Sequence, residues 1–315
     1  MRTLIVPASI LLFSLGAAWL QFTAEPDKIG DNEVLVMANQ TTNISAIDWV
    51  SEKQEVHITN KTDALGSYLW VEYIDKKIPD DPQYKYFIAG KNGDRLLESL
   101  SPLVGVRKLD ATTDLETLGL DTPTATLKVT SNGTTRSFSI GDEVYGTKDL
   151  YLRDDTSQEL FLVDDSKLRN LRQARTTLPN RALFAKETNQ ASSATLEWNE
   201  QSLALSHQNW QDTNSAKWIY TDQPDKDSTQ IQTWLSKLLR TSVSRSAAPD
   251  EDLSNLVPQF SLILNWEEQS STATYAKLPT DDSWWAKTPS TRGYVRISSR
   301  ALDGLMEDVP TLFPQ

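Results

Sequence analysis

Four pairs of adjacent aspartates are the residues of this sequence whose type and spacing could do chemistry. They are Asp80-Asp81, Asp154-Asp155, Asp164-Asp165 and Asp281-Asp282. A glycoside hydrolase works with two such carboxyl groups, one of them as the acid. Local structure explains the same pairs, because aspartate favours turns and helix starts, and Asp164-Asp165 precedes a helical pattern. We therefore predict that the pairs are structural, and a hydrolase that uses them stays the alternative.

Other reactive groups are scarce in the sequence. There is no cysteine, and His57 and His207 are the two histidines. Disulfides, thiolate nucleophiles and histidine-rich metal sites are therefore excluded. Asp222, Asp225 and Asp227 lack the glycine and final glutamate of a calcium-binding EF-hand loop. We predict no metal, no cofactor and no catalytic residue, so the protein is expected not to be an enzyme.

Charge and aromatic content bear on the class of partner. The chain has 31 Lys and Arg against 43 Asp and Glu, a net charge of −12, which argues against nucleic-acid binding. Among its ten tryptophans, Trp284 and Trp285 are adjacent. Neighbouring side chains of a strand point to opposite faces, so we expect one of these rings to be exposed. Trp284 and Trp285 are the candidate interface, since tryptophan is enriched where proteins bind partners.

Short strands and helices must position these residues. Asn132-Gly133 separates the alternating segments 124–129 and 136–140, which predicts a hairpin with a primed turn. Further strands are expected at 150–153 and 160–163. Thr113-Asp114-Leu115-Glu116 has the form of a capping box and predicts a short helix that ends at Gly119.

A pattern of apolar residues recurs in the two halves of the chain. Leu168 and Leu171 recur as Leu302 and Leu305, and the leucines before the first capping box recur as an apolar helical stripe over 231–239. The predicted fold class is α+β, with two tandem similar units that each have an antiparallel sheet and helices packed on one face. The expected domains are an N-terminal transmembrane anchor or uncleaved signal over 1–24, a tether over 25–43, a first unit over 44–180 and a second over 184–315.

The N-terminus has the pattern of a membrane segment. Residues 4–22 carry no charge and would reach about 28 Å as a helix, close to the thickness of a bilayer core. Arg2 precedes the run while Glu25 and Asp27 follow it, which predicts a cytoplasmic N-terminus and a periplasmic body. A signal peptide cleaved after Ala18 is the alternative, and it would leave a soluble periplasmic protein such as a chaperone.

Several motifs resemble those of a known bacterial family. The turn Leu118-Gly119-Leu120-Asp121-Thr122-Pro123 is followed by Phe138-Ser139-Ile140-Gly141, Tyr151-Leu152-Arg153 and Leu178-Pro179-Asn180-Arg181. Together they resemble the family catalogued as domain of unknown function 4340, most clearly over residues 90–185. The structural motif residues are Leu118, Gly119, Leu120, Pro123 and Gly141. The resemblance implies an auxiliary extracytoplasmic protein that accompanies ABC transport systems similar to the gliding-motility type.

The functional expectation combines these features. We expect a non-enzymatic, single-pass protein of the bacterial inner membrane whose exported body binds or scaffolds the membrane subunits of an ABC transporter, or other envelope proteins. Tethering would raise the local concentration of weak binding surfaces near their partner. The alternative is an envelope protein that binds glycan or peptidoglycan, or hydrolyses it, through exposed tryptophans and the acidic pairs.

Overall fold

The computed structural model describes residues 33–78, 80–212 and 214–313, which are 45% strand and 19% helix. All the strand pairings in this part of the chain are antiparallel. The strands of the first half are β1 (Val34–Met37), β2 (Ile44–Ser51), β3 (Gln54–Asp63), β4 (Gly66–Asp75), β5 (Gln83–Ile88), β6 (Leu103–Gly105), β7 (Arg107–Lys108), β8 (Ala125–Ser131), β9 (Thr134–Glu143), β10 (Leu150–Asp154) and β11 (Leu160–Val163). Those of the second half are β12 (Ser193–Trp198), β13 (Gln201–Gln208), β14 (Lys217–Tyr220), β15 (Val243–Ser246), β16 (Val257–Trp266), β17 (Gln269–Leu278), β18 (Ser283–Thr288) and β19 (Gly293–Ile297).

Nearly all of these strands belong to one large sheet. Its pairings run β7-β11-β10-β9-β8-β2-β3-β4-β5 through the first half and continue β15-β19-β18-β17-β16-β12-β13-β14 through the second. The two halves meet at β5 and β15, where Tyr86 pairs with Ser246. A separate two-stranded sheet joins β1 to β6.

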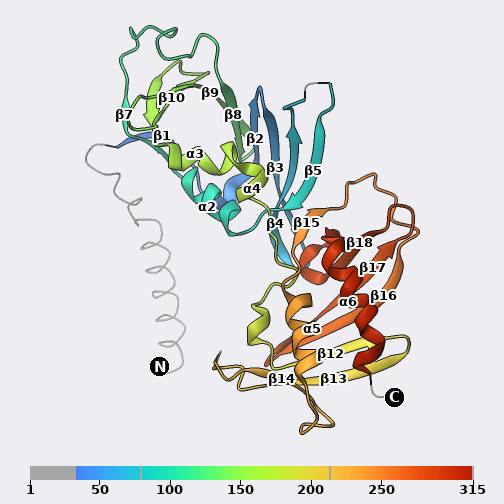
Figure 1. The fold of residues 1–315 in the computed structure, drawn as a ribbon. Helices are drawn as coiled ribbons and strands as arrows, with labels where there is room; N and C mark the ends of the chain where they lie inside the picture. The colour runs from blue at the N-terminus through green and yellow to red at the C-terminus, as the bar shows by residue number, and fades with distance from the viewer. Residues whose placement is uncertain (1–32, 79, 213, 314–315) are drawn as a thin grey trace, which may run out of the picture.

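The helices cover the two halves of the sheet separately (Figure 1). The first half carries α2 (Lys91–Ser99), α3 (Asp165–Arg172) and α4 (Ala174–Thr177), and the second carries α5 (Thr229–Leu239) and α6 (Ser299–Leu312). Each half has its own core: Leu96 and Leu168 pack with strand residues such as Leu127 in one, and Trp234 and Leu302 pack in the other. The 3-10 turns are η1 (Thr41–Asn43), η2 (Thr188–Gln190) and η3 (Pro289–Thr291).

The order of elements along the chain is the same in both halves. A three-strand meander (β2–β4, or β12–β14) leads to a helix (α2 or α5) and then to a returning strand (β7 or β15). A four-strand meander (β8–β11, or β16–β19) follows and ends in a helix (α3 or α6). The pairings β2–β8 and β11–β7 correspond to β12–β16 and β19–β15. The first half adds β1, β5, β6 and α4, and β5 is the strand that reaches the second half.

The predicted fold class is wrong. The described chain is mostly β, and its two halves share one antiparallel sheet instead of forming separate α+β units. Periodicity within a segment shows which face of a strand is buried, but it does not show which edge strands of distant segments will pair. The predicted helix at 113–119 is a series of turns. Gly119 does have the left-handed conformation expected at a helix end, with a φ of 64°, and the Leu120 N–H donates back to the Leu115 carbonyl.

The N-terminal predictions fall mainly outside the described residues, as does the whole of the segment expected to be a membrane anchor, 1–24. Within the described ranges, no helix combines the length and apolar character needed to span a membrane. The later part of the expected tether is folded: β1 pairs with β6, and Val36 and Met37 are buried in the first core. Burial of the Val36 and Met37 side chains in the first core is more favourable in free energy than their exposure in a linker would be.

Candidate functional site

The loop that carries the Gly119 motif packs against the sheet of the first half. Leu118 and Leu120 are buried in a small cluster with Leu160 of β11, while Pro123 is exposed. The Asp142 N–H donates to the Leu118 carbonyl over 2.9 Å, which fixes the loop along β9. The motif therefore packs this loop against the sheet.

Two glycines let the loop approach β9 closely. A Cβ atom at Gly141 would lie 2.2 Å from the Leu118 carbonyl oxygen, and one at Gly119 would lie 2.6 Å from the Asp142 carboxyl carbon. Gly119 also adopts the left-handed conformation that favours glycine. Both glycines are explained by packing.

The aspartates of β10 and α3 are held by structural partners. Asp154 is buried and pairs with Arg136, while Asp155 accepts hydrogen bonds from Ser137 and Ser139. Burial opposes ionisation of Asp154, but the Arg136 guanidinium and the N–H groups of the following turn outweigh it and lower its pKa. Asp164 caps α3 by accepting from the Ser166 N–H over 2.7 Å.

The remaining acidic residues also occupy local structure. Asp165 binds two arginines of its own helix, at residues 169 and 172. Asp281 accepts from the Ser283 N–H, and Asp282 lies 2.8 Å from the Lys277 ammonium. Asp80 and Asp81 are exposed at the turn before β5. No group of three His, Cys, Asp or Glu in the described ranges is arranged to hold a metal ion.

The expected exposure of Trp284 or Trp285 is wrong, because both rings are buried. They do point to opposite faces of β18. Trp284 faces the core of the second half and donates its indole N–H to Asp303 of α6 over 2.8 Å. The Trp285 ring lies on the other face, where the Arg245 guanidinium covers it at 5.0 Å from the ring centre. Arg245 is itself held by Glu251, so the segment after β15 removes the expected aromatic surface.

The two histidines lie apart and in different environments. His57 on β3 contacts Asp48 at 2.7 Å and Glu55 at 3.4 Å on the sheet surface. His207 on β13 is buried, stacks on Trp218 at 4.1 Å between ring centres, and bonds the Ala191 carbonyl through Nδ1. Neither histidine contacts a serine or threonine hydroxyl in a catalytic arrangement within the part of the chain described.

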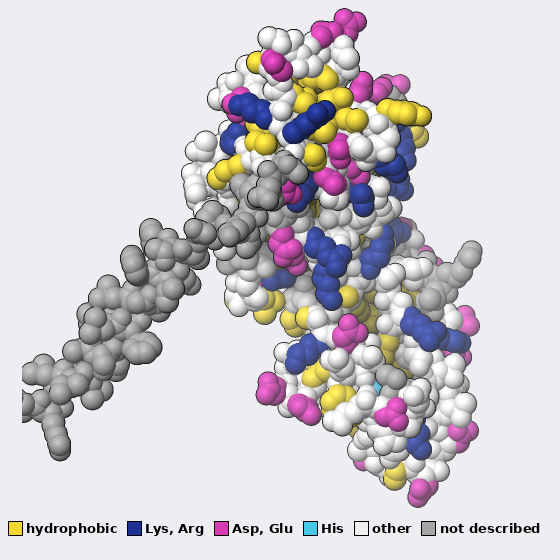
Figure 2. Space-filling model, turned by 90° about the vertical axis from the view of Figure 1, so that its left-hand side faces the viewer, with side chains coloured by type: hydrophobic (Ala, Val, Ile, Leu, Met, Phe, Trp, Pro, Cys, Tyr) yellow, Lys and Arg dark blue, Asp and Glu magenta, His cyan; other side chains and the backbone are white. Residues whose placement is uncertain are grey.

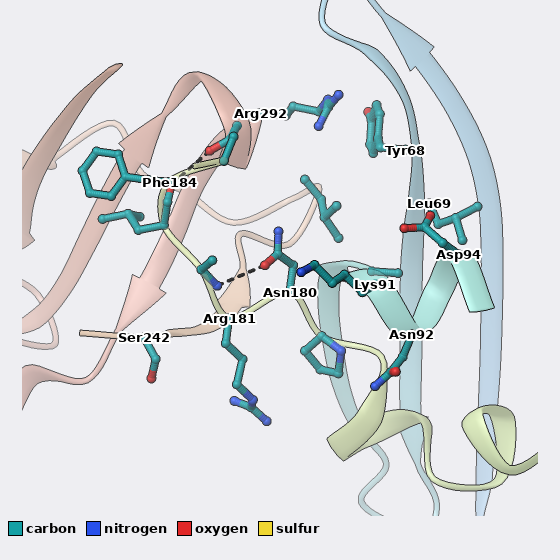
Figure 3. A pocket seen from close by; sticks show the side chains of 18 of the residues that line it. Tyr68, Leu69, Lys91, Asn92, Asp94, Asn180, Arg181, Phe184, Ser242 and Arg292 are labelled. Atoms are coloured by element: carbon teal, nitrogen blue, oxygen red, sulfur yellow. Dashed lines mark hydrogen bonds between the residues drawn. The ribbon is translucent and has the colours of Figure 1, made fainter. Parts of the chain in front are cut away.

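A large cavity lies where the two halves meet. This central cleft has a volume of about 1220 Å³. Its walls come from the β4 and α2 region of the first half, the segment that joins the halves, and the end of α5 together with Arg292 in the second half (Figure 3). Such junctions are common places for ligand binding.

The central cleft is basic although the protein is acidic. Its lining has six Lys and Arg residues and two acidic residues, Asp94 and Glu187, while the whole chain has a net charge of −12. The cationic residues are Lys91, Arg95, Arg181, Lys186, Arg240 and Arg292. Figure 2 shows Lys and Arg side chains gathered at the waist of the molecule, where the halves meet.

The segment 178–183, here called the connector, is bound to both halves by its backbone. The Asn180 N–H donates to the Ile88 carbonyl of β5 over 2.8 Å, and the Arg181 carbonyl accepts from the Val243 N–H of β15 over 3.0 Å. At its end, the Leu183 carbonyl accepts from the Thr288 hydroxyl over 2.8 Å. The connector therefore bridges Ile88 of β5 and Val243 of β15, away from the point where these strands pair directly, and it lines the cleft.

Comparison with known families gives one match. Residues 81–257 match the family described as domain of unknown function (DUF4340), which covers more than half of the chain. The protein belongs to this family. Comparisons with curated proteins and with solved structures find no match.

The DUF4340 match spans the junction of the two halves. It begins just before β5, includes the packed loop and the connector, and ends where β16 begins. The sequence indicated the connector only as the motif Leu178-Pro179-Asn180-Arg181, without a structural role. The central cleft was missed, because its basic residues are scattered along the sequence and no local pattern joins them. One signal in the sequence could have indicated the cleft: these Lys and Arg residues occur singly in a chain whose net charge is negative.

Proposed function

We propose that this protein is a non-enzymatic accessory component of the bacterial cell envelope that binds an ABC-type transport complex on its periplasmic side. The resemblance of its motifs to those of the family supports the transporter as partner. Its place would be the inner membrane, with the folded body in the periplasm. Its work would be to bind and position, not to convert a substrate.

The observation that carries this proposal is the position of the central cleft. Binding between two halves allows one partner segment to contact both of them and to fix their relative position. Within the described ranges the cleft lining offers cations, amides and hydroxyls, but no histidine or carboxylate pair arranged for acid–base work. Such a lining suits recognition.

The glycan-binding and hydrolase alternative loses its supports. The acidic pairs of 154–155, 164–165 and 281–282 are engaged in ion pairs, helix caps and turns, and Asp80 and Asp81 lie exposed at the turn before β5. Trp284 and Trp285 offer no exposed ring to a sugar.

Co-purification tests the proposal. The full chain with a C-terminal affinity tag is produced in its own bacterium, cross-linked briefly, extracted in mild detergent and recovered for mass spectrometry. We expect ABC transporter subunits to be enriched over a control in which the tag is carried by an unrelated periplasmic protein. Recovery of the chain without any transporter subunit, with and without the cross-linker, contradicts the proposal. Membrane fractionation of the same cells tests the location.

A further inference from the structure

We propose that the central cleft binds an extended acidic peptide segment of the partner protein. This inference rests on the proposed function and gives the partner segment its chemistry. Three features carry it: unpaired cations in the lining, their spread along the cleft, and apolar side chains among them.

The first feature is the lack of internal partners for the cations. Lys91, Arg181, Lys186 and Arg240 line the cleft, and none of them forms an ion pair with another described residue. Most other arginines of the described ranges do have a carboxylate, as Arg175 has Asp75 at 2.8 Å. A set of unpaired positive charges in an acidic protein attracts a negatively charged ligand and speeds its encounter.

Positive charge near the central cleft is not limited to the residues that line it. Lys85 of β5 has a lowered pKa because of its burial and, after that, because of the nearby Arg175, with Arg181 and Arg245 acting in the same direction. Arg181 therefore belongs both to the cleft and to a wider group of cations at the junction. A carboxylate bound at Arg181 would relieve this repulsion.

The second feature is the spread of these groups. In Figure 3, Lys91 lies beside Asn180, Arg181 points away from the connector, and Arg292 lies at the opposite end beside Tyr68. The groups do not converge on one point, as the donors around a single phosphate do. Negative charges spaced along an extended ligand match this arrangement. The volume of about 1220 Å³ also exceeds the range of about 300–1,000 Å³ that is usual for small-molecule pockets.

The third feature distinguishes a peptide from other polyanions. Tyr68, Leu97, Pro179 and Leu239 also line the cleft and are only partly buried. A peptide in which acidic and apolar residues alternate can place carboxylates on the cations and apolar side chains on these groups, as protein interfaces do. A polyphosphate chain has nothing to place there. The observations therefore favour an acidic peptide.

Fluorescence anisotropy with defined peptides tests the inference. The full chain in mild detergent is titrated against a fluorescein-labelled ten-residue peptide of alternating Asp and Leu, and against the same peptide with Asn in place of Asp. We expect the Asp peptide to bind at least tenfold more tightly, with a Kd that rises as NaCl is increased from 50 to 300 mM. Equal binding of the two peptides overturns the inference.

Charge-reversal variants locate the site. K91E, R181E and R240E combined should weaken binding of the Asp peptide at least tenfold. The matched control combines K53E, K148E and K217E, which change the net charge equally at exposed positions outside the cleft. The control should change Kd by less than twofold, and thermal unfolding checks that both variants are folded. Equal loss in both variants, or none in the first, overturns the cleft as the site.

Two further outcomes separate the inference from the function it rests on. If polyphosphate binds in the cleft more tightly than the Asp peptide, the inference of a peptide ligand is overturned, and a phosphate polymer is assigned as the ligand of the cleft. A chain that binds no peptide but still recovers transporter subunits overturns this inference alone. Peptide binding without any recovered transporter supports the cleft chemistry and contradicts the proposed function.

Discussion

A methyl group added at Gly141 and one added at Gly304 meet opposite surroundings. At Gly141 the new Cβ atom would lie 2.2 Å from the Leu118 carbonyl oxygen, so the packed loop would have to move. At Gly304, which is exposed within α6, nothing lies within 4 Å. We expect Gly141→Ala to lower the free energy of unfolding by about 1–3 kcal/mol, and Gly304→Ala to raise it by about 0.5–1 kcal/mol.

Urea unfolding of the two variants measures this difference. Because both variants replace glycine with alanine, they add the same methyl group, and the difference between them reports the surroundings of that group. Equal destabilisation at both positions would mean that the loop is not held against β9 as the structure shows.

The two histidines should affect stability in opposite directions as the pH changes. Burial lowers the pKa of His207, and the Ala191 carbonyl offsets only part of that. The unfolded chain then binds a proton that the folded chain excludes, so stability falls as the pH drops below the usual value of 6.5. Burial also opposes protonation of His57, but Asp48 and Glu55 outweigh it and raise its pKa. The stabilisation from protonated His57 is complete below 6.5 and is lost as the pH rises through its folded pKa.

Urea midpoints measured from pH 5 to 8.5 test both signs. His207→Gln should make the urea midpoint depend less on pH on the acidic side, whereas His57→Gln should make it depend less on pH above 6.5. The shapes of the curves are compared, since each substitution also changes packing. A His207→Gln variant that keeps the full acidic loss would place the titrating group elsewhere.

Some single-residue features could be predicted from the sequence and others could not. The Asn132-Gly133 turn was predicted correctly, and both residues have positive φ, because such a turn depends only on its own backbone. Asp164 was also predicted correctly as a helix cap. Trp285 was not, because its burial depends on Arg245 and Glu251 from another part of the chain.

At the scale of elements, the connector depends on backbone hydrogen bonds. Asn180→Pro removes the N–H that donates to the Ile88 carbonyl of β5, while Asn180→Ala keeps it and loses only the side-chain bond to the Ala182 N–H. We expect the proline variant to be less stable by about 1–3 kcal/mol and to be cleaved faster by trypsin after Arg181. The alanine variant should be cleaved at close to the wild-type rate.

Mass spectrometry of the tryptic fragments identifies the cleaved bond. Fast cleavage in both variants would show that the side-chain bond to Ala182, not the backbone bond to β5, holds the connector.

Elements with strong local signals were predicted well. The stripes over 231–239 and around Leu168 form α5 and α3, and the strands at 150–153 and 160–163 form β10 and β11. The segment at 113–119 was predicted as a helix, but it is too short to repay the cost of a helical nucleus, and its contacts with β9 favour turns. The junction of β5, the connector and β15 has no periodic signal, since it joins single residues from distant segments.

At the scale of the whole molecule, contacts among the described residues fix one half against the other. Besides the β5–β15 pairing and the connector, Arg292 of the second half binds the β3–β4 hairpin of the first. Its guanidinium lies 2.7 Å from the Asp63 carboxylate and 4.2 Å from the centre of the Tyr68 ring. Arg292 has a φ of 53°, which is unfavourable for a side chain other than glycine, so the surrounding contacts hold it in place. Because Arg292 also lines the central cleft, the same residue connects the arrangement of the halves with the proposed binding site.

Arg292→Gln should therefore widen the range of distances between the halves. The natural absence of cysteine allows spin labels to be attached only at an introduced pair, A64C on the β3–β4 turn and K287C on β18, both of which are exposed. Double electron–electron resonance should give a broader distance distribution in the Arg292→Gln variant than in the labelled parent. Arg296→Gln is the control, because Arg296 pairs with Asp281 inside the second half. An unchanged distribution in both variants would mean that β5, β15 and the connector suffice to fix the halves. Narrowing of the Arg292→Gln distribution by the acidic peptide would show that a ligand in the cleft can replace the lost contact.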